Sequence, residues 1–232
     1  MVASLVPPGS RVADVGTDHG LLPRLLLSSG RAAHCIATDF ARGPRQRHEE
    51  FAGRGEFGRK LEFRTGFGLR VLNRDDQLDV VVLSGLGARS IAGILEDRPP
   101  ARLGSVRLVL QPQSEPALVR RWLFDRTFSI TAEKLTIDRG RFYVAIAAEA
   151  GPGPFGPEHP LLDRAEIEEA GPCLVRSSDP LVRAFWRRVL RHQEKIIRSA
   201  ADGRGRETAE LRRTIARRVL NALGGEAAQR PR

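Results

Sequence analysis

The residues best suited to chemistry lie in one short segment near the start of the chain. Asp14, Gly16, Asp18 and Gly20 alternate directly after an apolar stretch, in the pattern Asp-x-Gly-x-Asp-x-Gly. Dinucleotide-binding turns follow Gly-x-Gly-x-x-Gly, so the carboxylate of Asp18 is a departure from that pattern. A negative charge there would repel a pyrophosphate and attract a sulfonium or an ammonium group. The segment therefore favours S-adenosylmethionine over a dinucleotide as ligand, and an ordinary structural turn is the alternative.

The elements that must position this segment alternate between strands and helices. Apolar stretches and turn signals predict strands over residues 11–15, 34–40, 61–65, 80–83, 107–112, 129–137 and 141–148. Helical spacing is expected over residues 21–27, 43–52, 91–95 and 116–128. Five strand–helix units closed by an antiparallel hairpin are the architecture of class I methyltransferases. We therefore predict an α/β fold with a Rossmann-like methyltransferase sheet over residues 1–150.

Three further loops follow predicted strands and would lie at the same edge of the sheet. Asp39 ends the second strand about 25 positions after Asp14, where a carboxylate can bind a ribose diol or cap a helix. Phe67 stands between two glycines, where its ring would stack on an adenine or fill the gap between strand and helix. The fourth strand ends in a second glycine-rich turn, Ser84-Gly-Leu-Gly87. Open α/β sheets bind ligands at this edge.

The C-terminal part of the chain has a different character. A Gly/Pro-rich linker over residues 151–157 precedes two helical stretches, 180–200 and 206–223, each with one apolar stripe. We expect residues 151–232 to form the linker and an α-helical hairpin that binds RNA. Arginines populate the other faces: Arg183, Arg187, Arg188, Arg191, Arg198, Arg212, Arg213, Arg217 and Arg218. Since acids are few among them, phosphate contact is favoured over a plain charged face.

The composition sets limits on function. The 232 residues carry a formal charge of +10, mostly from arginine, which indicates a polyanionic partner, with genomic codon bias as the alternative. Cys35 and Cys173 are the only cysteines, so we expect neither a disulfide framework nor a metal site. No apolar run approaches the roughly 18 residues of a membrane span. We expect a monomeric cytoplasmic protein whose start, directly before the first strand, is truncated or mis-assigned.

Several motifs, in order along almost the whole chain, resemble one family. They are Asp14-Val-Gly-Thr-Asp-His-Gly-Leu-Leu-Pro23, Ser84-Gly-Leu-Gly87, Gln111-Pro112, Arg121-Trp-Leu123, Phe142-Tyr143 and Gly171-Pro-Cys-Leu174. The chain is thus similar to the bacterial TrmK-type tRNA (adenine-22-N1)-methyltransferases. The resemblance implies a Rossmann-like domain with a C-terminal coiled-coil hairpin, S-adenosylmethionine as methyl donor and tRNA as acceptor.

The resemblance also implies where donor and acceptor would bind. Gly16, Thr17 and Asp18 would line the methionine end of the donor, and Asp39 would hold its ribose hydroxyls. The donor site is expected to comprise Asp14, Gly16, Thr17, Asp18, Asp39, Phe40, Gly66, Phe67, Gly68, Ser84 and Gly85. Contacts to the RNA are expected at Leu86, Gly87, Gln111, Pro112, Arg187, Arg191, Arg213 and Arg217.

Two departures from the family pattern keep a second function open. The family tends to have a polar residue where Phe67 stands, and Gly-Met-Gly-Gly where this chain reads Gly85-Leu-Gly-Ala88. The alternative is a non-catalytic RNA-binding protein with a degenerate methyltransferase fold. An NAD-dependent oxidoreductase is disfavoured by Asp18 and by the terminal β-hairpin.

Methyl transfer to adenine N1 does not require a strong general acid or base. N1 is a neutral lone pair at pH 7, so alignment rather than a strong base is needed. The target base must be unpaired and turned into the site, because N1 lies on its Watson–Crick edge. We expect Asp18 to orient the donor and His19 to pack against or hydrogen-bond the base. For His19, a capping or core role is the alternative.

Overall fold

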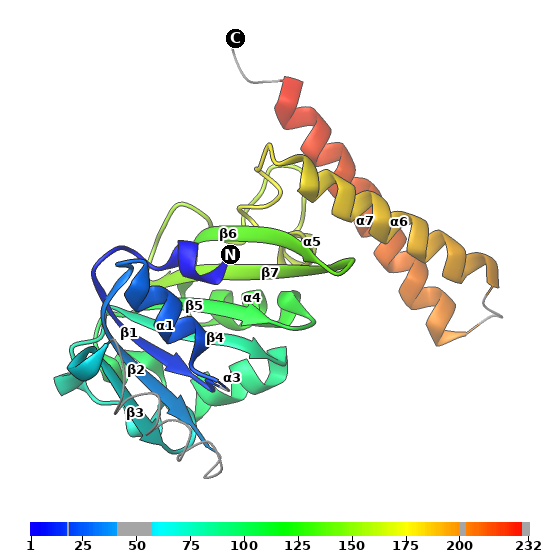
Figure 1. Cartoon of the computed structure of the whole chain (residues 1–232). Coiled ribbons are helices and arrows are strands. Elements are labelled where there is room, and N and C mark those ends of the chain that lie inside the picture. Colours follow the sequence, from blue (N-terminus) through cyan, green and yellow to red (C-terminus); the bar gives the residue numbers. More distant parts are fainter. Residues whose placement is uncertain (18, 41–56, 200–202, 229–232) are drawn as a thin grey trace.

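The computed structural model describes residues 1–17, 19–40, 57–199 and 203–228, and its centre is one seven-stranded sheet. The strands lie in the order β3-β2-β1-β4-β5-β7-β6, and Figure 1 shows their twist. They are β1 (Ser10–Val15), β2 (Ala32–Asp39), β3 (Leu61–Thr65), β4 (Val80–Leu86), β5 (Arg107–Pro112), β6 (Phe128–Asp138) and β7 (Arg141–Ala150). The first five are parallel, and β7 runs antiparallel to both β5 and β6. The predicted α/β, Rossmann-like sheet with its terminal hairpin is confirmed.

The helices connect and flank the strands. They are α1 (Leu21–Ser28), α3 (Ala88–Asp97), α4 (Pro116–Asp125), α5 (Arg164–Ala170), α6 (Pro180–Ser199) and α7 (Arg204–Ala228). Short 3-10 turns are η1 (Val2–Leu5), η2 (Gly58–Lys60), η3 (Gly68–Val71), η4 (Arg74–Asp76) and η5 (Pro100–Leu103). The helix predicted over 43–52 lies outside the described residues. None of the described helices is long and apolar enough to cross a membrane.

Two boundaries differ from the sequence prediction. The helix expected to run to Phe128 ends at Asp125, because Thr127 adopts a φ of +54° and Phe128 already pairs with Ala150 in the sheet. The helix α5 was not predicted, since seven residues are too few to show a helical period. Its start is nevertheless marked by a capping box between Asp163 and Glu166.

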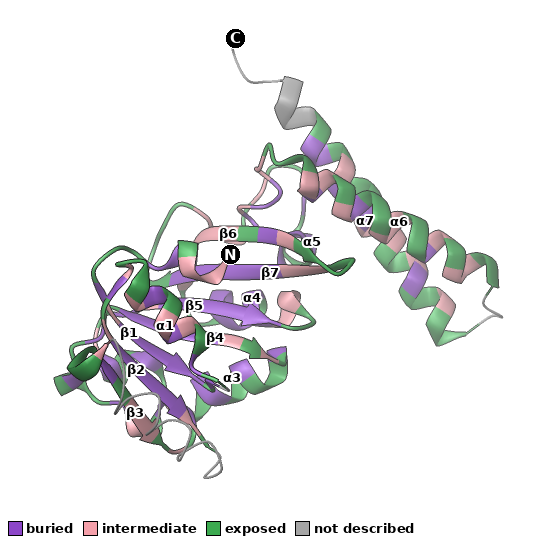
Figure 2. Ribbon diagram, viewed as in Figure 1, coloured by how far each residue is buried: buried purple, intermediate pink, exposed green. Residues whose placement is uncertain are grey.

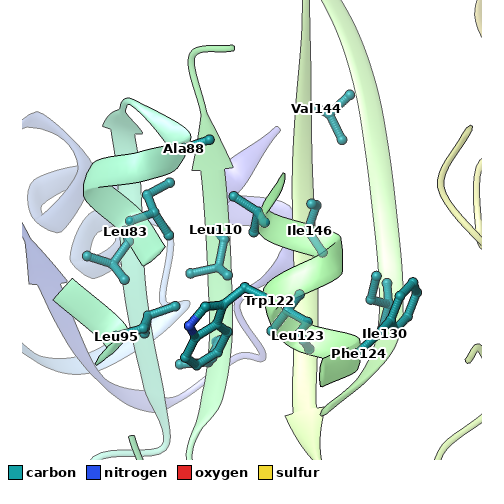
Figure 3. Packing of buried hydrophobic residues seen from close by; sticks show 14 of the residues in the cluster. Leu83, Ala88, Leu95, Leu110, Trp122, Leu123, Phe124, Ile130, Val144 and Ile146 are labelled. Atoms are coloured by element: carbon teal, nitrogen blue, oxygen red, sulfur yellow. The ribbon is translucent and has the colours of Figure 1, made fainter. Parts of the chain in front are cut away.

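The core lies on both faces of the sheet, because successive strand residues point to opposite sides. One cluster, with Val12, Val80 and Val82, packs under α1 and η1. The other faces α3 and α4, where Trp122 and Leu123 pack near the sheet (Figure 3). This second cluster continues without a break into the C-terminal helices.

The helices α6 and α7 form the expected hairpin, called the arm below, which projects beyond the sheet (Figure 1). Figure 2 shows buried and exposed residues alternating along both helices. The predicted stripe of α7 is wrong at Leu211, which is 63% exposed. The small residues Ala209 and Ala216 are buried, as are Val219 and Leu223 of the predicted stripe.

The sheet with α1, α3, α4 and α5 is called the body below. Side chains from the body and from the arm hold the two together. The rings of Phe142 and Phe185 meet edge-to-face with centroids 5.0 Å apart. The guanidinium of Arg188 donates a hydrogen bond to the carbonyl of Gly140 at the tip of the β6–β7 hairpin, at 2.7 Å. The arm is therefore held against the strands at the end of the sheet order.

Candidate functional site

The carboxyl ends of the five parallel strands gather the predicted donor and acceptor residues at one edge of the sheet. β1 and β4 are neighbours at the centre, and the chain runs outward from them in opposite directions, towards β3 and towards β5. The place where the strand order reverses in this way is called the topological switch point, and open α/β sheets bind ligands there. The turns after β1, β2 and β3 lie on one side of this point, and those after β4 and β5 lie on the other.

The turn after β1 is held by hydrogen bonds to the neighbouring strand. The amides of Gly16 and Thr17 both donate to the carbonyl of Thr38, at 2.8 and 3.0 Å. Gly16 is exposed and has a φ of +81°, a conformation that side chains disfavour. The backbone at Gly16 is therefore open to a ligand, while Thr17 lies buried behind it.

Asp14 lies beneath this turn and is 5% exposed. Burial raises the pKa of its carboxyl to about 6, an effect that the hydrogen bond with the Thr17 side chain partly offsets. Asp14 is therefore covered by the protein, and the exposed residue of this turn is Gly16.

The ends of β2 and β3 present a carboxylate and two aromatic rings. Asp39 is half-buried, and its carbonyl accepts a hydrogen bond from the Gly66 amide at 2.9 Å. Phe40 and Phe67 are 72% and 44% exposed, and their rings meet edge-to-face with centroids 6.0 Å apart. Part of the Phe67 ring is therefore accessible, which favours stacking on a ligand over a role in packing alone. A flat ring system and a diol would find complementary groups here.

The turn after β4 touches the turn after β1. A Cβ atom on Gly16 would lie 3.4 Å from Cδ2 of Leu86, so the predicted donor and acceptor residues adjoin at this point. Ala88, one of the family departures, is buried in the core, so its extra methyl group does not face this edge. Gly87 is exposed at the start of α3.

Gln111 is buried and its amide is bonded within the chain. Its Oε1 accepts from the Gly85 amide at 3.0 Å and from the Ser84 hydroxyl at 3.2 Å, and its Nε2 donates to the Pro112 carbonyl at 2.9 Å. Gln111 therefore positions the turn after β4, and any effect on RNA passes through that turn.

Of the two residues predicted to act on the reacting groups, the structure describes only His19. Asp18 lies outside the described residues. His19 is exposed, which excludes the alternative of a core histidine. The described residues contain no group of three or more His, Cys, Asp or Glu side chains that could hold a metal ion.

The predicted RNA-contacting arginines are not brought to the sheet edge but lie along the arm. Arg187 and Arg191 are exposed on α6. Arg217 is 57% exposed and pairs with Glu194 at 3.2 Å. Arg213 is half-buried, and its Nε has no partner within the described part of the chain.

Some of the other arginines on the arm are bonded within the protein. Arg183 donates to the Leu223 carbonyl at 2.8 Å, and Arg218 pairs with Glu166 of α5 at 2.9 Å. With Arg188, described above, these residues fasten the arm together or to the body. The spacing of arginines on a helix cannot distinguish these roles.

Two features at the junction of body and arm were missed from the sequence. Arg120 of α4 and Glu133 of β6 form a fully buried ion pair at 2.8 Å. Gln193 of α6 is a buried amide, 6% exposed, within the apolar stripe of the arm. A polar residue in the stripe was visible in the sequence; the ion pair was not, because its two members come from different elements.

A doubly wound sheet with its loops gathered at the switch point and an antiparallel final hairpin defines a Rossmann-like class I methyltransferase. The chain belongs to the TrmK family, tRNA (adenine(22)-N(1))-methyltransferase, whose model matches residues 12–221. The family resemblance of the motifs is thus confirmed.

Known relatives match over nearly the whole chain. The tRNA (adenine(22)-N(1))-methyltransferase of Bacillus subtilis is 28% identical over 204 residues, covering 87% of this chain and 84% of the relative. A crystal structure of a Streptococcus pneumoniae putative tRNA (m1A22) methyltransferase in complex with S-adenosyl-L-methionine is 30% identical, with a TM-score of 0.77 and coverage of 94% and 96%. The B. subtilis crystal structure is 26% identical, with a TM-score of 0.75 and coverage of 94% and 95%.

Proposed function

We propose that this protein transfers a methyl group from S-adenosylmethionine to N1 of an adenine in tRNA, at position 22. The observation that carries the proposal is the joining of the turns after β1 and β4 at Gly16 and Leu86, with Asp39 and the exposed aromatic pair beside them. Family membership supplies the substrate class. A monomeric state and a cytoplasmic location belong to the same proposal.

The residues at the edge fit the proposed donor. Asp39 would hold the ribose hydroxyls, Phe40 and Phe67 would flank the adenine, and Gly16 and Thr17 would face the methionine end. Asp18, Asp14, Gly66, Gly68, Ser84 and Gly85 complete the proposed donor site. When bound, the donor supplies an electrophilic methyl group on a sulfonium. The two residues that depart from the family pattern, Phe67 and Ala88, leave this edge of the sheet open. The ring of Phe67 is exposed, and the methyl group of Ala88 is buried in the core.

The chain's own task is to hold the target adenine in line with the methyl group. The proposed acceptor contacts are Leu86 and Gly87, with Gln111 and Pro112 supporting them. Orientation of this kind can supply roughly 7–11 kcal/mol of the barrier. His19 would pack against or hydrogen-bond the base, and the proton lost afterwards from the exocyclic amine can pass to water. No general base is required.

The arm would bring the RNA to this edge through phosphate contacts. Arg187 and Arg191 are the exposed candidates, with Arg217 and the half-buried Arg213 beside them. Such contacts supply affinity without sequence information, so selection of the tRNA would come from RNA shape and from unpaired bases.

The proposal is tested by incubating the protein with unmodified tRNA and labelled donor, followed by nucleoside mass analysis and mapping of the modified position. We expect 1-methyladenosine at position 22. Absence of donor binding by calorimetry, with tRNA binding retained, would instead support the non-catalytic alternative.

A single substitution tests the donor site. Asp39→Ala should weaken donor binding about 10- to 100-fold, because hydrogen bonds to a charged group contribute roughly 1.5–3 kcal/mol. The matched control is Asp75→Ala, since Asp75 is an exposed carboxylate on η4, before β4. Calorimetry with S-adenosylmethionine would measure both, and equal affinities would contradict the assignment of Asp39.

A further inference from the structure

A cavity of about 200 Å³ lies between the body and the arm. It is several times larger than the roughly 30 Å³ of a water molecule and smaller than the roughly 300–1,000 Å³ of drug-sized ligand pockets. Its size suits a single small ring system. Its walls include Arg120, Val144, Phe185, Trp186, Gln193 and Ile215.

The residue of this cavity that best indicates a ligand is Gln193. The residue as a whole is 6% exposed and lines the cavity, and its amide makes no hydrogen bond with the described residues, although the amide atoms are not fully enclosed. The residue lies four positions after Val189 and four before Ile197, in the apolar stripe of α6. An amide that lines a cavity and has no partner within the protein can bond to a ligand or to ordered water. An amide offers two donors and an acceptor, which is the complement of a nucleobase edge.

The other walls suit a flat ring. Phe185 and Trp186 are in contact, with ring centroids 5.3 Å apart, and Trp186 is 4% exposed. Aromatic side chains beside an amide are how proteins commonly bind unpaired RNA bases. Exposed Arg212 and Glu169 also line the cavity, where Arg212 can meet a phosphate and Glu169 can accept from a base amine.

The cavity lies level with the acceptor side of the sheet edge. Ile146 of β7 pairs with Leu110 of β5, so Val144, two residues earlier, stands beside the end of β5 at Pro112. One RNA molecule on the arm can therefore reach both places.

We propose that this cavity binds one unpaired nucleobase of the tRNA substrate, other than the methylated adenine, with its hydrogen-bonding edge against the amide of Gln193. The inference rests on the proposed function, because the arm must first hold the RNA. It adds a base-specific contact to the phosphate contacts of the arginines.

The first test is Gln193→Leu in the full-length protein, with unmodified tRNA as the probe. We expect tRNA binding to weaken by roughly tenfold, as for the removal of a base contact. Donor affinity should be unchanged, and the melting temperature should stay the same or rise, since an amide that makes no hydrogen bond with the described residues is replaced by an apolar group of similar size. A merely structural residue would instead lower the melting temperature together with RNA affinity, which would overturn the inference.

The second test locates the base. Chemically assembled tRNAs, each with one abasic nucleotide, are measured against wild type and Gln193→Leu. At one position, the abasic site should weaken wild-type binding roughly tenfold and the variant's binding little, so that the two effects are not additive. Abasic sites elsewhere serve as the matched controls. Strict additivity at every position would overturn the inference.

A filling substitution completes the set. Val189→Phe narrows the cavity from α6 and should weaken tRNA binding as Gln193→Leu does. If both variants bind tRNA like wild type while wild type methylates it, the cavity holds only solvent and the inference is wrong. If wild type neither binds nor methylates tRNA, the proposed function itself has failed.

Discussion

The sheet edge and the body–arm junction both contain buried carboxylates, and they are built in different ways. At the edge, Asp14 is buried without a cationic partner among the described residues, and main-chain hydrogen bonds shape the turn above it. At the junction, Glu133 is buried against the guanidinium of Arg120. The edge is therefore a backbone site with a titratable group beneath it, while the junction depends on a buried ion pair between two side chains.

The junction pair also reaches into the segment before the arm. Arg120 donates to the carbonyls of Glu168 and Glu169 at 2.7 and 2.9 Å, and Glu133 accepts from the Cys173 amide at 3.0 Å. A Cβ atom on Gly171 would lie 2.5 Å from an oxygen of Glu133, so only glycine fits there. The pair thus fixes the chain that leads into α6.

The largest effect we predict comes from breaking this pair. Arg120→Met leaves the carboxyl of Glu133 buried without its cationic partner, and should lower the free energy of unfolding by about 3–5 kcal/mol. The matched control is Arg121→Met, because Arg121 is 62% exposed and its pair with Glu168 should be worth about 1 kcal/mol or less. Urea denaturation measures both, and equal decreases would contradict the contrast.

The double variant Arg120→Met with Glu133→Leu refines that result. Replacing both charges with apolar groups should recover most of the stability, as for other buried pairs. We expect the double variant to bind tRNA more weakly than wild type, since the amides of Cys173 and Leu174, which Glu133 holds, would lose their acceptor. Full recovery of both properties would show that the pair does not position the arm.

The same contrast explains how much the sequence could predict. The strands and the turn after β1 follow from local patterns, such as the apolar run at Val80 and the glycines around Thr17, so they were predicted correctly. The pairing of Arg120 with Glu133 depends on two elements whose distance no local pattern encodes. Similarly, Leu211 fits a helical stripe in sequence but is exposed, whereas Val219 and Leu223 of the same predicted stripe are buried.

The next effect concerns pH and the edge. Asp14 has a folded-state pKa near 6 against 3.8 for an ordinary aspartate, so its protonated form favours the fold. Its contribution to stability is fully present below about pH 4 and is lost as the pH rises through 6. Relative to Asp14→Asn, the wild type should therefore lose roughly 2.5 kcal/mol between pH 4 and pH 7.

Unfolding by urea at a series of pH values, in wild type and Asp14→Asn, measures this difference directly. Other carboxylates, such as Asp76, have lowered pKa values and act in the opposite direction, but they are common to both proteins and cancel. If the free energy of unfolding changed with pH in the same way in both proteins, Asp14 would not be protonated in the folded state. The contrast between a titratable carboxyl at the edge and an ion pair at the junction would then be wrong.

The smallest effect lies on the arm's surface, where charge is exposed rather than buried. Arg187→Ala with Arg191→Ala should leave unfolding and donor affinity unchanged, because both side chains are exposed. Binding of tRNA should weaken, and the slope of log affinity against log salt should fall by about one for each phosphate that the arm no longer binds. The matched control is Arg102→Ala, since Arg102 is an exposed arginine on η5, before β5 and away from the arm. Salt screens exposed charges, so these arginines affect RNA affinity mainly by pairing directly with phosphates. A salt slope that is unchanged in the double variant would therefore mean that the RNA binds to another surface of the protein.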